Sequence, residues 1–246
     1  MRPDFYPESL LRAVERWQKG GDSAAKRTRG ARLKNEVLSS LPDSLFRRCT
    51  ETVYRRLALN QSSIWSFVTT GSLPETISAW TLDIEIAKGI KGGVPEEWNT
   101  GKRWFGVILS HKPSPDEVIV NLETLWLDLQ YQRSIQHYGP DRFKEGIFRY
   151  ENSQREVVLE ISKVSLRNIV SWGGSSGPIE YIAHLFFDKK ATEEEVRWLE
   201  NVAQENDIKI GPRWTTPEGA RNVTLRVLKR ARHKGFPIPT DPQFLP

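Results

Sequence analysis

Apolar residues recur along the chain with two different spacings, and each spacing predicts a different kind of element. Helical spacing predicts an amphipathic helix over residues 1–20 and a shorter helix over residues 33–41. The basic stretch 26–34 lies between them. We interpret it either as a solvated loop or helix face, or as an arm that contacts phosphates.

The middle of the chain contains short apolar runs that predict strands. These lie at residues 50–59, 104–109, 118–120 and 157–159, and residues 77–88 predict a strand that turns into a helix. Gly71 and Pro74 interrupt the pattern, so we expect a loop over residues 60–76. Residues 131–150 have the composition of a polar connection that contains several aromatic side chains.

The last third of the chain predicts a further strand and two helices. The strand is expected at residues 179–187, after a glycine-rich loop at residues 173–178. A capping box at residues 192–195 marks the start of the first helix. The second helix, residues 219–234, is strongly basic. Its outer face is expected either to be merely solvated or to bind nucleic acid or an acidic partner.

Composition narrows the class of protein. The chain has 246 residues, a formal net charge of +5 and one cysteine, Cys49, so it cannot form an internal disulfide. It contains no apolar run long enough to span a membrane and no signal-peptide core at its start. These features predict a soluble cytoplasmic protein, with no membrane partner, in a reducing compartment.

The residues with the clearest chemical potential precede the predicted strand at 157–159. Gln154 and Glu156 are two positions apart, and in an extended chain such side chains point to the same face. An amide and a carboxylate would then project together over the strand.

Two further pieces lie upstream in the sequence. Tyr54 precedes Arg55 on the predicted strand at 50–59. The run Ser78-Ala-Trp-Thr81, followed by Asp83, lies where a strand turns into a helix. Together with Gln154-x-Glu156, these pieces resemble the Arg–Ser–Glu class of mono-ADP-ribosyltransferases in type and order. The resemblance covers roughly residues 50–162.

The resemblance implies a fold and a division of the chain. The expected fold is α+β, an ADP-ribosyltransferase-like split β-sandwich with flanking helices. Residues 50–164 would form the transferase core. Residues 1–49 would be a helical, basic N-terminal extension, and residues 165–246 a C-terminal α/β extension that carries the basic helix.

The resemblance also implies roles for individual residues. Glu156 would be the catalytic carboxylate and Gln154 would orient the acceptor. Arg55 would grip the phosphates of NAD, because a guanidinium meets phosphate oxygens with two parallel hydrogen bonds. NAD would also contact Ser78, Trp80 and Thr81, and either Ser78 or Thr81 would fill the family's serine role. The acceptor would contact Phe148 and Tyr150.

The activity implied is NAD-dependent transfer of ADP-ribose, with NAD as substrate and no metal. In this family, Gln at the position of Gln154 goes with acceptors other than arginine, including asparagine and nucleic-acid bases. Because the chain also has two basic segments, we expect RNA or DNA as acceptor. By analogy, such an enzyme is a toxin of a toxin–antitoxin or phage-defence system, with an antitoxin protein as a possible partner.

Several alternatives stay open. The acceptor can be a protein side chain, or NAD can be hydrolysed without one. The chain can also be a non-catalytic nucleic-acid-binding module that uses the same basic segments. A metal-dependent nuclease is disfavoured, because Glu160 and Lys163 are three positions apart and a strand would point them to opposite faces.

Overall fold

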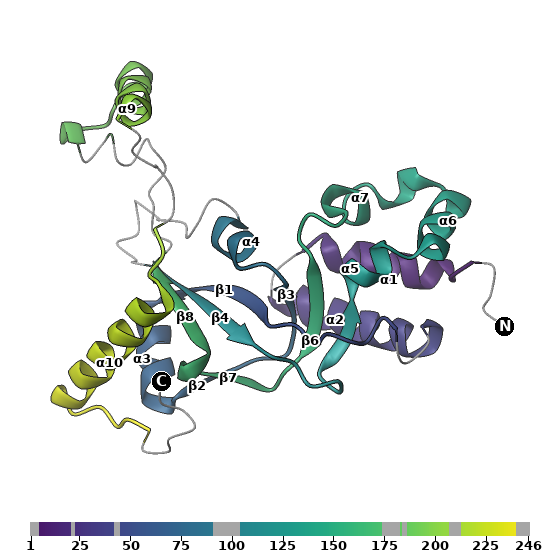
Figure 1. The fold of residues 1–246 in the computed structure, drawn as a ribbon, viewed down its shortest axis with the longest axis horizontal. Helices are drawn as coiled ribbons and strands as arrows, with labels where there is room; N and C mark the ends of the chain where they lie inside the picture. Colours follow the sequence, from purple (N-terminus) through teal and green to yellow (C-terminus); the bar gives the residue numbers. More distant parts are fainter. Residues whose placement is uncertain are drawn as a thin grey trace. The chain divides into compact units, whose positions relative to one another are not determined.

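The structure is a computed structural model that describes residues 5–20, 23–41, 45–90, 104–173, 183, 186–206 and 213–239. The fold is α+β, as predicted, with a six-stranded sheet in the order β5-β6-β3-β1-β4-β8 and a two-stranded sheet, β2-β7 (Figure 1). The pairs β1/β3, β3/β6, β4/β8 and β5/β6 are antiparallel. The finer prediction of a split β-sandwich stays a prediction.

The chain forms two compact units that interleave along the sequence. Unit 1 contains residues 1–55, 74–84 and 110–164, and unit 2 contains residues 56–73, 85–109 and 165–246. The stretch 1–49, which we expected to be an extension, thus belongs to unit 1 together with the strands that carry Ser78 and Glu156.

Unit 1 combines three strands of the large sheet with most of the helices of the chain's first two thirds. Its strands are β3 (Ile77–Thr81), β5 (Val118–Asn121) and β6 (Glu156–Glu160). Its helices are α1 (Glu8–Gln18), α2 (Ser23–Ser40), α5 (Leu122–Trp126), α6 (Leu129–Tyr138), the 3-10 turn η2 (Pro140–Phe143) and α7 (Ile147–Tyr150). The predicted polar connection at 131–150 is therefore wrong, because three helical segments occupy it.

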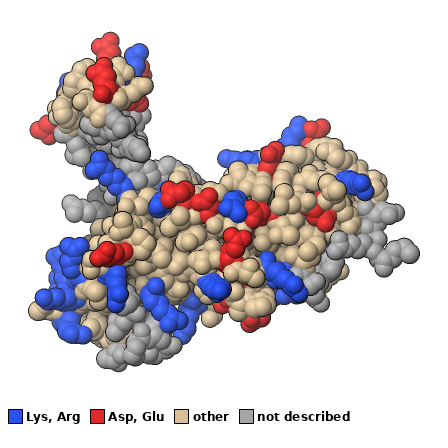
Figure 2. Space-filling model, in the orientation of Figure 1, with Lys and Arg blue, Asp and Glu red and all other residues tan. Residues whose placement is uncertain are grey.

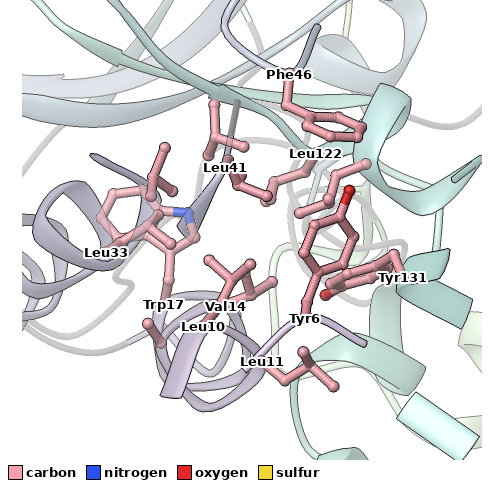
Figure 3. Close-up of a cluster of buried hydrophobic side chains, with 14 of the residues drawn as sticks. Tyr6, Leu10, Leu11, Val14, Trp17, Leu33, Leu41, Phe46, Leu122 and Tyr131 are labelled. Atoms are coloured by element: carbon pink, nitrogen blue, oxygen red, sulfur yellow. The ribbon is translucent and has the colours of Figure 1, made fainter. Parts of the chain in front are cut away.

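The core of unit 1 is a cluster of buried side chains gathered around α1. Figure 3 shows them converging from α1, α2 and the segments that follow, among them Tyr6, Leu10, Leu11, Val14, Trp17, Leu33, Leu41, Phe46, Leu122 and Tyr131. Full burial of one such leucine contributes about 1.5–3 kcal/mol. The amphipathic helix predicted at the N-terminus is thus confirmed, and its apolar face is the centre of the unit.

A buried carboxylate ties α1 to the start of α7. Glu15 accepts hydrogen bonds from the backbone N–H of Glu145 (3.1 Å) and of Ile147 (2.7 Å). A Cβ added to Gly146 would lie 2.3 Å from the Glu15 carbonyl oxygen, so only glycine allows this approach. The negative side chain also offsets the orphan N–H groups at the beginning of α7.

Unit 2 contains strand β8 (Ile169–Gly173). Its described helices include α3 (Gln61–Thr70), η3 (Leu166–Asn168), α9 (Glu193–Glu205) and α10 (Pro217–His233). The capping box of α9 is present at Thr192 and Glu195, as predicted. The prediction of a loop over residues 60–76 is wrong for α3, which Asn60 caps at its beginning and Gly71 (φ 72°) at its end.

Along the sequence, the chain passes from one unit to the other within five elements. They are β1 (Val53–Asn60), β2 (Ser72–Pro74), α4 (Ile84–Gly89), β4 (Trp104–His111) and β7 (Lys163–Ser165). Of the strand predicted at residues 179–187, only Ala183, Phe186 and Phe187 are described, and they are helical, so that prediction is wrong at these positions. The loop predicted at residues 173–178 lies outside the described residues apart from Gly173.

Candidate active site

The three sequence motifs fall on neighbouring strands. The order β6-β3-β1 places the strand that begins with Glu156 beside the Ser78–Thr81 strand, which in turn lies beside the strand that carries Tyr54 and Arg55. The register is specific: Thr81 is the partner of Glu156 on one side and of Tyr54 on the other. Thr81 is thus adjacent in the sheet to residues that lie 27 and 75 positions away in the sequence.

Strand alternation divides these residues between the two faces of the sheet. Side chains that are directly opposite in an antiparallel pair share a face, so Tyr54, Thr81 and Glu156 lie on one face. Arg55 follows Tyr54 by one position, and Ser78 and Trp80 are an odd number of positions from Thr81. Because successive side chains of a strand alternate between its two faces, these three residues lie on the other face. The contact between the Arg55 guanidinium and the Trp80 ring (6.0 Å to its centroid) agrees with this.

Glu156 is a buried carboxylate held by the end of α1. The Trp17 indole N–H donates to Glu156 Oε1 at 2.6 Å, and the Gln18 amide donates to Oε2 at 3.5 Å. Only 6% of the residue is exposed. Burial raises the pKa of the Glu156 carboxyl, while the hydrogen bonds from Trp17 and Gln18 and the charge of Lys26 oppose that rise. One oxygen is therefore firmly positioned and the other is weakly held.

Gln154 does not lie on the strand with Glu156. Residues 151–154 form a turn, and Arg155 has a left-handed backbone (φ 43°) before β6 begins at Glu156. The expectation that the two side chains project together from an extended chain is therefore wrong. The Arg155 side chain forms an ion pair with Glu123 (2.6 Å), which holds the turn against α5.

The face that carries Glu156 is not fully covered. Ala79 lies on β3 between Ile77 and Thr81 on this face, opposite the buried Val158, and it is exposed. An exposed residue on a strand that is paired on both sides means that solvent reaches the sheet surface there. Because the side chain at position 79 is only a methyl group, it protrudes little from the sheet surface near Glu156.

Arg55 and its neighbours form a polar cluster on the opposite face. Arg55 Nη1 donates to Glu75 Oε2 at 2.8 Å, and the Trp80 indole N–H donates to Ser78 Oγ at 3.0 Å. Burial lowers the pKa of Arg55, and the charge and hydrogen bond of Glu75 oppose that change, so the guanidinium stays charged. The Trp80 ring also lies 5.9 Å from the His111 ring.

The two aromatic residues expected to touch the acceptor lie on α7. Phe148 packs edge-on against Trp126, with 6.4 Å between ring centroids, and lies against the hydrophobic core. Tyr150 is half-buried and lies under the Arg149 guanidinium (5.4 Å). Neither residue has a described contact with Glu156, Thr81 or Ala79.

A cavity of about 630 Å³ lies at the other end of the β3/β6 pair. Its lining residues are Arg27, Glu75, Thr76, Ile77, Glu117, Glu160, Ile161 and Ser162. Burial raises the pKa of Glu117, but hydrogen bonds from the Ser114 N–H and His111 outweigh it, so the net pKa is lowered. The carboxylates that line the cavity already have partners: Glu75 pairs with Arg55, Glu117 with His111 and Glu160 with Lys34.

Sequence reasoning missed Trp17, Gln18 and the exposure of Ala79. The helical spacing at residues 10–17 predicted that Trp17 is buried, but no local signal indicated that its N–H points to a carboxylate 139 positions away. Within the described residues, no group of three or more His, Cys, Asp or Glu side chains can hold a metal ion.

In the part of the chain that the structure describes, no helix is both long and apolar enough to cross a membrane. No protein-family model matches the chain, and neither a curated protein nor a solved structure shows significant similarity to it.

Proposed function

We propose that the chain is an NAD-dependent mono-ADP-ribosyltransferase whose catalytic carboxylate is Glu156. The observation that carries the proposal is the register of three neighbouring strands, in which Thr81 is opposite both Glu156 and Tyr54. The exposed surface at Ala79, on the same face, offers the place for the nicotinamide ribose. Of the two candidates for the family's serine role, Thr81 rather than Ser78 shares a face with Glu156.

The chemistry explains why a carboxylate is needed. When the bond between the ribose C1′ and the nicotinamide nitrogen breaks, its electron pair leaves with nicotinamide and positive charge develops on the ribose. Ionised Glu156 stabilises that charge more in the transition state than in the ground state. The acceptor then forms a bond to C1′ and loses a proton.

The roles of Trp17 and Gln18 follow from their contacts. Trp17 is a positioning residue that fixes Oε1 of Glu156, whereas Oε2, 3.5 Å from Gln18, is left for a ribose hydroxyl. Because burial raises the pKa of Glu156, the ionised form requires a higher pH than for an ordinary glutamate. The rate of nicotinamide release is therefore expected to rise with pH through an acid limb above pH 4.5.

The phosphate-binding role of Arg55 is not part of this proposal, since Arg55 lies on the face opposite Glu156 and is bound to Glu75. Gln154 remains the candidate for orienting the acceptor from its turn beside β6. A nucleic-acid acceptor fits the excess of positive charge on the chain. The alternatives are transfer to a protein acceptor and hydrolysis of NAD without an acceptor. An assay that offers several acceptors distinguishes them.

The test uses NAD labelled in its adenine moiety, with total RNA, sheared DNA and lysate protein as separate acceptors. Nicotinamide release is measured in parallel. Glu156→Gln is expected to abolish both transfer and release, because it keeps the shape of the side chain and removes its charge. Glu160→Gln is the matched control on the same strand and face, and it is expected to retain activity.

The label decides between the readings. Label on RNA or DNA supports the nucleic-acid acceptor, and label on protein keeps the transferase and replaces that acceptor. Release without transfer indicates hydrolysis. Neither transfer nor release, or full activity in Glu156→Gln, contradicts the proposal and favours a non-catalytic binding module.

A further inference from the structure

Helix α10 is anchored to unit 2 by one side of its surface. Its buried residues Ala220, Thr224, Leu228 and Ala231 recur at helical spacing, and the helix packs on β8 and α3 (Figure 1). The Trp172 indole N–H donates to Thr224 Oγ1 at 2.9 Å, which fixes the rotation of the helix. The apolar side of α10 is thus occupied within unit 2.

The outward side of α10 forms a strongly basic surface. It consists of the exposed residues Arg221, Arg226, Lys229, Arg230, Arg232 and Lys234. Figure 2 shows a group of blue side chains where α10 lies in Figure 1. The 17 residues of the helix span about 25 Å. Within the described residues, no carboxylate forms an ion pair with any of the six, and Glu218 is the helix's only acidic side chain.

The arrangement exceeds what helix stability requires. Cations in the last turn complement the helix dipole, which accounts for Arg230 and Arg232 but not for Arg221 or Arg226. Moreover, Arg226 and Arg230 are four residues apart, as are Arg230 and Lys234, and like charges at that spacing repel. A polyanion that covers the face relieves this repulsion.

Aromatic rings adjoin the C-terminal end of the basic surface. Trp65 of α3 stacks on Phe236, with 5.3 Å between centroids and 18° between planes. The Lys234 ammonium lies 5.7 Å from the centre of the Trp65 ring. Phe236 is 41% exposed, so part of its ring is free to stack with a further planar group.

We propose that α10, together with Trp65 and Phe236, binds single-stranded nucleic acid. Regularly spaced phosphates match a row of arginine and lysine side chains, and exposed rings stack with unpaired bases. An anionic membrane fits less well, because the apolar side of α10 faces β8 and α3 and, of its outward residues, only Leu225 is a large apolar one. This binding surface lies in unit 2 and goes beyond the proposed transferase activity.

The test measures binding of fluorescent oligothymidylate of about 20 nucleotides by the full chain without NAD, at several NaCl concentrations. If six phosphates are contacted, the logarithm of the binding constant is expected to fall against log salt with a slope of about −4. The variant Arg226→Gln/Lys229→Gln/Arg230→Gln is expected to bind at least about tenfold more weakly, with a slope shallower by about 2.

The matched control is Arg12→Gln/Arg142→Gln/Lys144→Gln, which makes the same change in net charge on unit 1. It is expected to bind like the unmodified protein. Phe236→Ala is expected to weaken binding of the single strand by roughly fivefold or more while leaving binding of a matched duplex nearly unchanged. Circular dichroism and a thermal melt check that each variant is folded.

Three results would overturn the inference: equal losses in the two triple variants, no binding of oligothymidylate by the unmodified protein, or binding only to vesicles that contain phosphatidylserine. Performing the titrations also with Glu156→Gln separates this inference from the proposed function. Binding that persists while transfer is absent retains the surface, whether or not the enzyme assignment holds.

Discussion

Glu156 and the basic face of α10 are two opposite ways in which this molecule carries charge. Glu156 is buried, and the groups that hydrogen-bond to it, Trp17 and Gln18, are uncharged. The α10 cations are exposed, and no described carboxylate forms an ion pair with them. In the first region burial disfavours the ionised form of the carboxyl. In the second region several charges are exposed to solvent and accessible to partners.

The difference shows which property each region controls. The protonation of a buried ionisable group is coupled to folding, because burial removes the water that stabilises the ionised form. Exposed charges hardly affect folding but dominate long-range attraction to a polyanion. Changes near Glu156 are therefore expected to alter stability and pH dependence, and changes on α10 to alter binding.

The largest expected effect is on the free energy of unfolding, when a side chain of the buried core around α1 is shortened. Leu11→Ala, at a fully buried position, is expected to lower the free energy of unfolding by about 2–5 kcal/mol. Leu225→Ala on the outward side of α10, where the side chain is 46% exposed, is expected to change it by less than about 0.5 kcal/mol. Urea denaturation measures both, and similar losses would remove the contrast.

The second prediction concerns the donor to the buried carboxylate. Trp17→Phe keeps an aromatic ring in the core but removes the N–H that binds Glu156 Oε1, and it is expected to cost about 1–3 kcal/mol. In a Glu156→Leu background, which has no acceptor for this N–H, the same change is expected to cost less, which a double-mutant cycle detects. Trp198→Phe, on α9 where Trp198 is 49% exposed, serves as the control. Additive losses would show that the hydrogen bond contributes nothing.

The third prediction is the pH dependence of Glu156. Its pKa is raised in the folded state, so the folded state binds the proton more tightly than the unfolded state does. Its contribution to stability is thus complete below the unfolded pKa and is lost as pH rises from about 4.5 through the raised folded pKa. The difference in unfolding free energy between the unmodified protein and Glu156→Gln is expected to fall over that window.

Glu160→Gln checks the previous prediction, because Glu160 lies on the same strand and pairs with Lys34 at the surface. A decline common to both variants would come from the loss of a carboxylate in general and not from the burial of Glu156. A flat curve for Glu156→Gln would mean that the carboxyl is solvated in solution, which contradicts its burial.

The smallest expected effect is on the stability of α10. Arg226→Gln/Lys229→Gln/Arg230→Gln is expected to leave the free energy of unfolding within about 0.5 kcal/mol, or to increase it slightly, because like-charge repulsion is relieved. Thermal denaturation at low and high salt measures this. A loss of several kcal/mol would show that these cations form structural contacts and would weaken the contrast with Glu156.

Local patterns predicted much of the secondary structure. The amphipathic spacing from Leu10 to Trp17 identified α1, and the capping box at Thr192 identified the start of α9. Helix α3 was missed because its sequence contains no charged residue and ends in β-branched residues, which favour strands. Its apolar positions Ile64, Phe67 and Val68 do follow helical spacing, but Gly71 was interpreted as part of a loop instead of as a C-cap.

The candidate site was harder to predict, because its geometry depends on strand register. The sequence identified Tyr54, Thr81 and Glu156, but only the pairing of β1, β3 and β6 brings them to one face. The left-handed backbone at Arg155 broke the two-residue alternation on which the pairing of Gln154 with Glu156 depended. Shifting a strand's register by one residue exchanges its faces, and no short motif encodes that choice.

The hydrogen bonds between Glu15 and the start of α7 also bear on how the chain folds during synthesis. Glu15 and Ile147 are 132 positions apart, and the Tyr6 N–H likewise depends on Ser134, 128 positions later. At a ribosomal rate of about 5–20 residues per second, the N-terminal helix emerges on the order of ten seconds before its partners exist. The nascent apolar face of α1 is then open to chaperones until residue 147 leaves the exit tunnel.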